Sequence, residues 1–204
     1  MAARRTAALL LLLSALTACG RGGGADPAPV LPSAAASPST QATDAAWVQL
    51  MIPMTGQAVV LLDLAAEKGH GPRLRSWAAR LRSAQATELA GLRRLRDRMG
   101  LPDTDVHKGH DMPGMVTADD LDDARRTGGT AFDRLVVARI RDHLRQSQQV
   151  SRSETTAGSR AEAKARARAL VTARGEQLAD LTALCAGGAA DVPEPFACPS
   201  DHPV

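Results

Sequence analysis

A stripe of apolar side chains between residues 73 and 99 places the strongest constraint on the fold. Its members recur every three or four residues, and arginines fill many of the positions between them. Because an α-helix turns once in about 3.6 residues, this spacing predicts an amphipathic helix that packs one face against other helices. We interpret the arginines as a solvated surface. The stripe comprises Leu74, Trp77, Leu81, Gln85, Glu88, Leu92, Leu95 and Met99.

Three further segments are predicted to be helical. The first covers about residues 47–68 and ends before two glycines and a proline, which are helix stop signals. Another begins after Thr117, a good N-cap, and the pair Gly128-Gly129 is expected to break it. The last covers about residues 159–184. The polar stretch 147–159, rich in Ser and Thr, is predicted to be a mobile connection.

The composition also favours an all-α domain. The 204 residues include abundant Ala, Leu and Arg, which favour helices, but only two Trp, two Phe and no Tyr. An all-β sandwich would be richer in aromatic residues. With 25 Lys and Arg against 22 Asp and Glu, the charge is too balanced for a nucleic-acid-binding domain. We therefore expect no nucleic-acid partner.

The second and the last predicted helices resemble each other. Residues 78–92 match residues 167–181 at six of fifteen positions, all of them Ala or Leu. The same offset of 89 residues places Met54 opposite His143. Two such helix-pair repeats would pack as an up-down four-helix bundle with short loops. We expect this bundle domain to cover residues 45–184.

The N-terminus predicts export. Residues 1–18 begin with a positive segment that contains Arg4 and Arg5, followed by an apolar stretch too short to span a bilayer. The sequence Leu-Thr-Ala-Cys at residues 16–19 resembles the lipobox of bacterial lipoproteins, in which the Cys thiol receives a diacylglycerol. We therefore predict an exported protein, anchored through acylated Cys19 to lipid on the extracytoplasmic face of the cell membrane. An ordinary signal peptide with a chance Cys is the alternative.

Two segments flank the predicted bundle. Residues 19–44 are dominated by Gly, Ala, Pro, Ser and Thr, and we expect them to form a flexible tether. Residues 185–204 form a C-terminal tail. In an oxidising compartment, Cys185 and Cys198 most simply form a disulfide that pins this tail to the last helix. A metal-binding cysteine pair is the rival interpretation, although neither residue lies in a CxxC motif.

The segment between the two predicted helix pairs has the most distinctive chemistry. Within nine residues it contains His107, His110, Met112 and Met115, together with Asp111. Imidazole and thioether together suit a soft ion, above all Cu(I), whereas zinc prefers histidine with thiolate or carboxylate. Glycines and a proline interrupt the segment, so we expect a loop. The alternative is that the methionines pack onto the bundle and the histidines are solvated.

Four short motifs together match a known sequence pattern. Residues 110–115 read H-D-M-P-G-M, residues 132–135 read F-D-R-L, and residues 85–88 read Q-A-T-E. Residues 51–58 read M-I-P-M-T-G-Q-A. These motifs resemble those of bacterial exported proteins in domain-of-unknown-function family 305, whose repeats open with M-I-x-H-H-x-x-A and carry Q-x-x-E on the second helix. The resemblance covers about residues 46–184 and implies a ferritin-like fold.

The chain departs from the pattern that this resemblance implies. Met54 and Thr55 replace the first histidine pair, and only His143 remains of the second. Arg174 stands at the Gln position of the second Q-x-x-E motif. An intact di-metal centre needs several Glu and His ligands that project inward, and they cannot be assembled here. We therefore expect no enzymatic activity.

Met54, Glu88 and His143 remain as an inner set. A Met/His pair can hold a soft cation, but a single His among apolar residues can equally be a core residue. A buried Glu88 carboxylate would need a partner, because a lone buried charge is costly. The correspondence of the two repeats predicts that Arg174 supplies this partner.

Two functions remain open from the sequence. The first is a copper-binding envelope lipoprotein that sequesters or transfers the ion without catalysis. The second is a structural or interaction lipoprotein whose ancestral metal site has decayed. Either would contact membrane lipid, and the sequence does not name an envelope protein partner. The candidate metal ligands are His107, His110, Met112 and Met115 in the loop, with His143 and Met54 inside the bundle.

Overall fold

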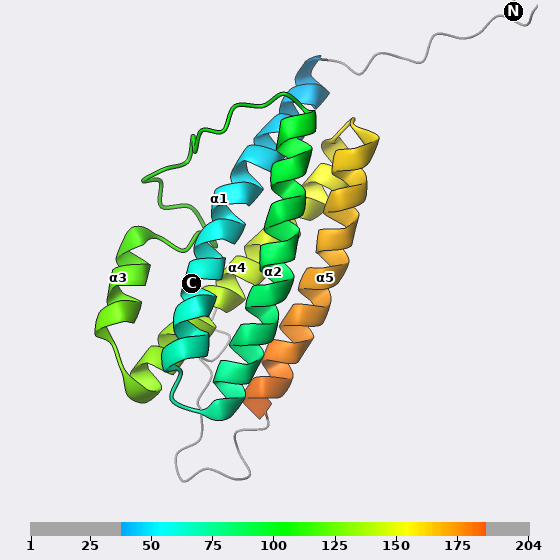
Figure 1. The fold of residues 1–204 in the computed structure, drawn as a ribbon. Coiled ribbons are helices and arrows are strands. Elements are labelled where there is room, and N and C mark those ends of the chain that lie inside the picture. The colour runs from blue at the N-terminus through cyan, green and yellow to red at the C-terminus, as the bar shows by residue number, and fades with distance from the viewer. Residues whose placement is uncertain (1–37, 187–204) are drawn as a thin grey trace, which may run out of the picture. The chain divides into compact units, whose positions relative to one another are not determined.

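The computed structural model describes residues 38–186, with side chains from residue 41 onward, and this range contains helices and loops but no strand (Figure 1). Within it, five helices follow one another along the chain. They are α1 (Pro38–Lys68), α2 (Pro72–Arg98), α3 (Ala118–Arg126), α4 (Gly129–Ala157) and α5 (Ala161–Ala186). The predicted all-α fold class is confirmed.

Two helix pairs make up the bundle. α1 packs along α2, and α4 packs along α5, with short connections at residues 69–71 and 158–160. Contacts of α1 with α4, and of α2 with α5, join the two pairs. The linker, which we define as residues 99–117, connects the pairs, and the short α3 lies against α1 and α4 (Figure 1). The structure thus has the predicted bundle of two helix pairs.

α1 begins earlier than predicted. It starts at Pro38 and not near residue 47, so residues 38–44, which the sequence placed in the tether, are helical. Residues Gln41–Lys68 are long and apolar enough to cross a bilayer by length and composition. However, Met51 and Leu61 are fully buried in the apolar core of the bundle. We therefore interpret α1 as a core helix.

The prediction of a mobile connection at residues 147–159 is wrong. α4 continues through Ala157, and Ser147 and Ser151 are fully buried on its inner side. Glu154 is also buried. Because these polar side chains face the interior, the apolar period that marks a helix in the sequence is lost over this stretch.

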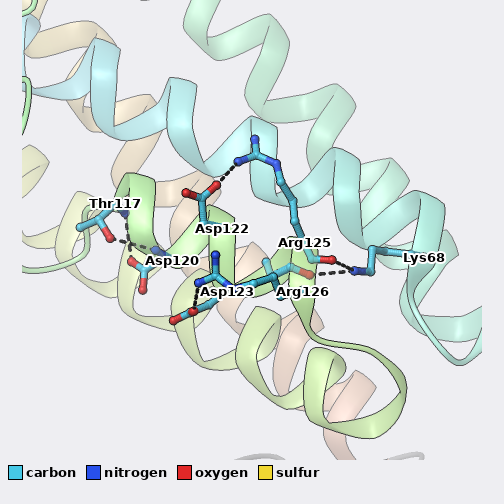
Figure 2. Close-up of polar contacts among 8 residues, drawn as sticks. Lys68, Thr117, Asp120, Asp122, Asp123, Arg125 and Arg126 are labelled. Carbon is cyan, nitrogen blue, oxygen red and sulfur yellow. Dashed lines mark hydrogen bonds and ion pairs between the residues drawn. The ribbon is translucent and has the colours of Figure 1, made fainter.

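α3 fixes the end of the linker through both of its termini (Figure 2). The hydroxyl of Thr117, the predicted N-cap, accepts a hydrogen bond from Asp120 N at 3.1 Å, and the Asp120 carboxylate accepts one from Thr117 N at 2.9 Å. Asp120 also forms an ion pair with Arg139 of α4 at 2.8 Å.

The expected break at Gly128-Gly129 separates α3 from α4. At the α3 C-terminus, Lys68 Nζ donates to the carbonyl oxygens of Ala124, Arg125 and Thr127 at 2.8, 2.9 and 2.8 Å.

The core consists of two apolar clusters. The larger contains Trp77 and Phe132 and draws residues from all five helices. The smaller lies among α1, α2 and α5 and contains Met51 and Met54. The linker reaches both clusters, because Val116 belongs to the larger and the half-buried Met115 packs against the smaller. The position of the linker is therefore tied to the packing of the bundle.

Candidate metal site

A tight turn brings the two linker histidines together. His110 N donates to His107 O at 2.9 Å, and His107 N donates to the Asp105 carboxylate at 2.9 Å. Gly109 lies inside this turn with φ +80°, a left-handed conformation that favours glycine. The imidazole rings of His107 and His110 meet edge to face, with centroids 6.2 Å apart and an interplanar angle of 74°.

This ring separation is compatible with one shared ion. A metal–nitrogen bond of about 2.0 Å places each ring centre about 3.2 Å from the ion, so two rings can share it up to a separation of about 6.4 Å. The observed 6.2 Å lies inside that limit. His107 is half-buried and His110 is exposed, so an ion could reach the pair from solvent.

Two hollows border the linker. The first, which we call the imidazole hollow, has a volume of about 440 Å³ and is lined by His107, His110 and Met115, among others. The second, which we call the Met112 hollow, has a volume of about 360 Å³ and is lined by Met112 and Met115. Three of the four predicted linker ligands therefore share one hollow, whereas Met112 lies in its neighbour and Met115 borders both. The carboxylates of the imidazole hollow are those of Asp105, Asp111 and Asp119.

The metal ligands are not preassembled in a larger group. Within the described residues, no three His, Cys, Asp or Glu side chains are close enough to hold an ion together. The site consists of two imidazoles in contact, with a thioether and carboxylates around them. Chemically, such a set can bind a soft ion through two nitrogens and one sulfur after modest side-chain rotation.

The glycine of the H-D-M-P-G-M motif has a steric role. Gly114 adopts φ +72°, and a Cβ atom at this position would lie 2.4 Å from Gln146 Cβ and 2.9 Å from Asp142 O. Only glycine allows the linker to approach α4 this closely. Gly114 therefore seats the linker on α4 directly beside His143, whose imidazole interacts with the Gly114 backbone.

His143 is a neutral imidazole in the bundle interior. Burial lowers its pKa well below the usual value, and the nearby positive charge of Arg174 lowers it further, against a smaller opposing effect of the Gly114 backbone. Neither ring nitrogen has a well-aligned hydrogen-bond partner in the described part of the chain. Met54, the other inner candidate, is buried in the smaller apolar cluster. An ion shared by this pair stays a prediction.

The predicted ion pair between Glu88 and Arg174 is confirmed. Arg174 Nη1 lies 2.7 Å from Glu88 Oε2, and the Arg174 side chain is fully buried. The same guanidinium donates to Ser147 Oγ and to Gln177 Oε1, each at 2.8 Å. Sequence reasoning missed Ser147, although it lies four residues after His143 and therefore on the same face of α4. A fixed positive charge beside His143 disfavours a second cation in the interior.

Two cysteines of the predictions lie outside the described residues. They are Cys19, the expected lipidation site, and Cys198, the expected disulfide partner of Cys185. Both the anchor and the disulfide therefore stay predictions.

A comparison of the sequence with models of protein families identifies the family of this chain. The domain of unknown function DUF305 matches residues 44–185, which is most of the chain. The chain belongs to the DUF305 family. The family resemblance drawn from the linker and helix motifs is thereby confirmed. No curated protein matches this DUF305 chain.

Two solved structures of DUF305 proteins share the fold. A candidate secreted DUF305 protein from Streptomyces coelicolor superposes with a TM-score of 0.63 at 18% identity, covering 72% of this chain and 94% of its own. A DUF305 fragment from Deinococcus radiodurans gives a TM-score of 0.62 at 17% identity, covering 73% and 96%. At such low identity these similarities establish the helical fold alone.

Proposed function

We propose that this DUF305 protein binds copper at the linker and sequesters or transfers it in the cell envelope, without catalysing a reaction. The observation that carries the proposal is the contact between the His107 and His110 imidazoles in a hollow that Met115 also lines. Two imidazoles with a thioether form a ligand set that suits Cu(I) better than zinc or magnesium. The thioether of Met112, one hollow away, can join when the linker adjusts.

The proposed location is the extracytoplasmic face of the cell membrane. It rests on the signal-like residues 1–18 and on Cys19 within its Leu-Thr-Ala-Cys sequence. The DUF305 protein from Streptomyces coelicolor, described as a candidate secreted protein, has the same fold and is consistent with export. A disulfide between Cys185 and Cys198 would suit the same oxidising compartment.

A competition titration tests copper binding. Residues 20–204 are titrated with Cu(I) under reducing conditions against a chelator of known affinity, with Zn(II) in parallel. We expect one-to-one binding that is lost in the His110→Ala/Met115→Leu variant. The matched control is His70→Ala/Met99→Leu, which removes an exposed histidine and a half-buried methionine that line neither hollow. If the chain does not compete for Cu(I), or if both variants bind like the parent, the proposal is wrong.

One observation favours a structural role as the second candidate. Arg174 places a fixed charge where a metal would otherwise sit near His143, and Gly114 seats the linker firmly on α4. In this alternative the linker has only a structural role, because its packing on the bundle holds the two helix pairs together. Changing Met112 and Met115 to Leu would then leave both Cu(I) behaviour and unfolding nearly unchanged, because Met-to-Leu exchanges are usually mild.

A further inference from the structure

One end of the bundle brings together the start of α1, the end of α2 and the turn between α4 and α5 (Figure 1). Arg98 of α2 forms an ion pair with Glu162 of α5. The Asp44 carboxylate of α1 accepts hydrogen bonds from Ser159 N and Arg160 N of the turn. We call this part of the bundle the proximal end and define it as residues 41–47, 91–98 and 151–167.

The proximal end carries an excess of positive charge. It contains eight Lys and Arg against four Asp and Glu. Two of the four acids, Asp44 and Glu154, are buried, and the exposed Asp97 and Glu162 each pair with an arginine of α2. Five basic side chains of this end form no ion pair with any residue that the structure describes. They are the exposed Arg94, Arg152 and Arg160 and the half-buried Lys164 and Arg166.

Positive charge is most concentrated where α2 meets α5. A Cβ on Gly91 of α2 would lie 2.8 Å from Arg166 Nη2, so this guanidinium lies against the backbone of α2. The hydrogen bond from Arg98 lowers the pKa of Glu162, and the charges of Arg160 and Arg166 lower it further. Three guanidinium groups therefore act on one exposed carboxylate.

The opposite end of the bundle has no such excess. Its residues, 61–82, 118–140 and 176–186, contain nine Lys and Arg and nine Asp and Glu. Several of these charges pair with each other, as Asp63 does with Arg82 and Asp122 with Arg125. The net positive charge of the bundle is therefore concentrated at the proximal end.

The predicted tether is attached to the proximal end. Residues 19–37 directly precede Pro38, the first residue of α1. A flexible chain of this length has a root-mean-square span of about 25 Å. By comparison, a helix of 27 residues such as α2 is about 40 Å long. A lipid on Cys19 would therefore hold the proximal end nearer to the membrane than the opposite end.

We propose that the proximal end of the bundle docks onto the anionic phospholipid headgroups of the membrane that holds the anchor. Guanidinium groups bind phosphate oxygens through charge-assisted hydrogen bonds, and a basic surface adds a second attraction to that of acyl chains. Docking fixes the orientation of the bundle relative to the membrane. The inference rests on the proposed location and is independent of copper binding.

Vesicle binding tests this surface separately from the anchor. Residues 20–204, which lack Cys19, are sedimented with vesicles of phosphatidylglycerol and phosphatidylcholine, or of phosphatidylcholine alone. We expect binding to the anionic vesicles only, and weaker binding at about 0.5 M salt because salt screens the charges. Arg94→Glu/Arg152→Glu should lower the partition coefficient about thirtyfold or more.

The matched control changes the same charge at the opposite end. Arg80→Glu/Arg134→Glu also replaces two exposed arginines, so the net charge of the two double variants is equal. We expect this control to lower the partition coefficient by less than about threefold, since its changes lie away from the lipid. Circular dichroism verifies that both variants keep their helicity. Equal losses in the two variants would overturn the proposal.

Amine labelling locates the contact in the unmodified chain. Anionic vesicles should slow the acetylation of Lys164 at the proximal end and leave that of the exposed Lys108 in the linker unchanged, as measured by mass spectrometry. Protection of Lys108 without Lys164 would contradict the proposal.

Lipid labelling of the full chain separates the surface from the anchor. If anionic vesicles do not bind residues 20–204, the docking proposal is wrong even when Cys19 incorporates radiolabelled palmitate, and the proposed location then stands without it. If these vesicles bind as expected but Cys19 incorporates no palmitate, the result supports the basic surface and contradicts the anchor.

Discussion

Arg174 holds a positive charge at a position with no exposed surface. Its guanidinium is stable there because three oxygen acceptors surround it, from Glu88, Ser147 and Gln177. A buried charge without such partners would cost several kcal/mol. The arginine therefore performs locally what a bound cation would do, since it compensates the Glu88 carboxylate. Burial lowers the pKa of His143, and the charge of Arg174 lowers it further.

The first prediction concerns the loss of this charge. Arg174→Gln should lower the free energy of unfolding by about 3 kcal/mol, because Glu88 and Ser147 lose their partner inside the bundle. Urea unfolding measures this effect, and Arg80→Gln at an exposed position is the control, with an expected change within about 0.5 kcal/mol. The pKa of His143, followed by NMR, should rise because a neighbouring positive charge is removed. An unchanged pKa would contradict the assigned interaction.

The second prediction isolates the close approach at Gly114. Gly114→Ala should destabilise the fold by about 2–4 kcal/mol, since it combines left-handed strain with a clash against Gln146. Gly100→Ala is the matched control: its φ is +67°, but no atom lies within 4 Å of the added Cβ. It should therefore cost only about 1–2 kcal/mol from strain. Equal losses in urea unfolding would show that the contact of the linker with α4 contributes nothing.

At the scale of helices, a carboxyl pair joins the start of α1 to the turn between α4 and α5. Asp44 is buried and accepts hydrogen bonds from Ser159 N at 3.0 Å, from Ser159 Oγ at 2.7 Å and from Arg160 N at 3.0 Å. Glu154 of α4 interacts with the same carboxylate. A Cβ on Gly158 would lie 2.3 Å from Glu154 Oε1 and 2.7 Å from Asp44 Oδ1, so glycine is needed at this turn.

The third prediction follows from the protonation of this pair. Burial raises the pKa of Glu154 to about 8, supported by the hydrogen bond to Asp44 and by its charge, while Lys164 opposes the shift. Burial alone would raise the pKa of Asp44, but the hydrogen bonds from Glu154, Ser159 and Arg160 together lower it. At neutral pH, Glu154 is therefore protonated, and its carboxyl O–H donates a hydrogen bond to the ionised Asp44 carboxylate.

The raised pKa of Glu154 determines whether stability rises or falls with pH. Between the usual glutamate pKa of 4.5 and about 8, the folded state binds more protons than the unfolded state at Glu154, so stability falls as the pH rises. We expect a loss on the order of 2–4 kcal/mol between pH 5 and 9. Glu154→Gln should flatten this decline, because the amide keeps a donor for Asp44 without ionising. Urea unfolding at several pH values measures it, with the exposed Glu176→Gln as control; a decline of equal slope in Glu154→Gln would refute the assignment.

The helices differ in how much of them the sequence could predict. The α2 stripe, the Thr117 cap and the Gly128-Gly129 break all depend on local spacing or local hydrogen bonds, and they are confirmed. The end of α4 and the start of α1 depend on partners far along the chain. The Asp44 carboxylate, for example, accepts hydrogen bonds from Ser159 N and Arg160 N, which lie 115 and 116 positions further along the chain. Such distant polar pairing leaves no period in the sequence.

At the scale of the whole chain, the candidate metal site lies beside the bundle and not within it. The residue types of the linker were predictable from the sequence, as was the Glu88–Arg174 pair. The division of the thioethers between two hollows was not, because it depends on how the α3 caps and Gly114 seat the linker. Since His107 and His110 belong to neither apolar cluster, folding should not depend on the ion.

The last prediction uses this separation of site and core. Without metal, the parent chain and the His107→Ala/His110→Ala variant should unfold within about 0.5 kcal/mol of each other, because the changed side chains lie outside the core. Cu(I) at a hundredfold excess over its dissociation constant should stabilise the parent by about 2.7 kcal/mol, by mass action on the folded state. The variant should gain nothing. Chemical unfolding with and without Cu(I), under reducing conditions, measures all four states. Loss of helicity when copper is chelated would instead show that folding requires the ion. Equal stabilisation of the variant by Cu(I) would show that the ion binds elsewhere in the chain.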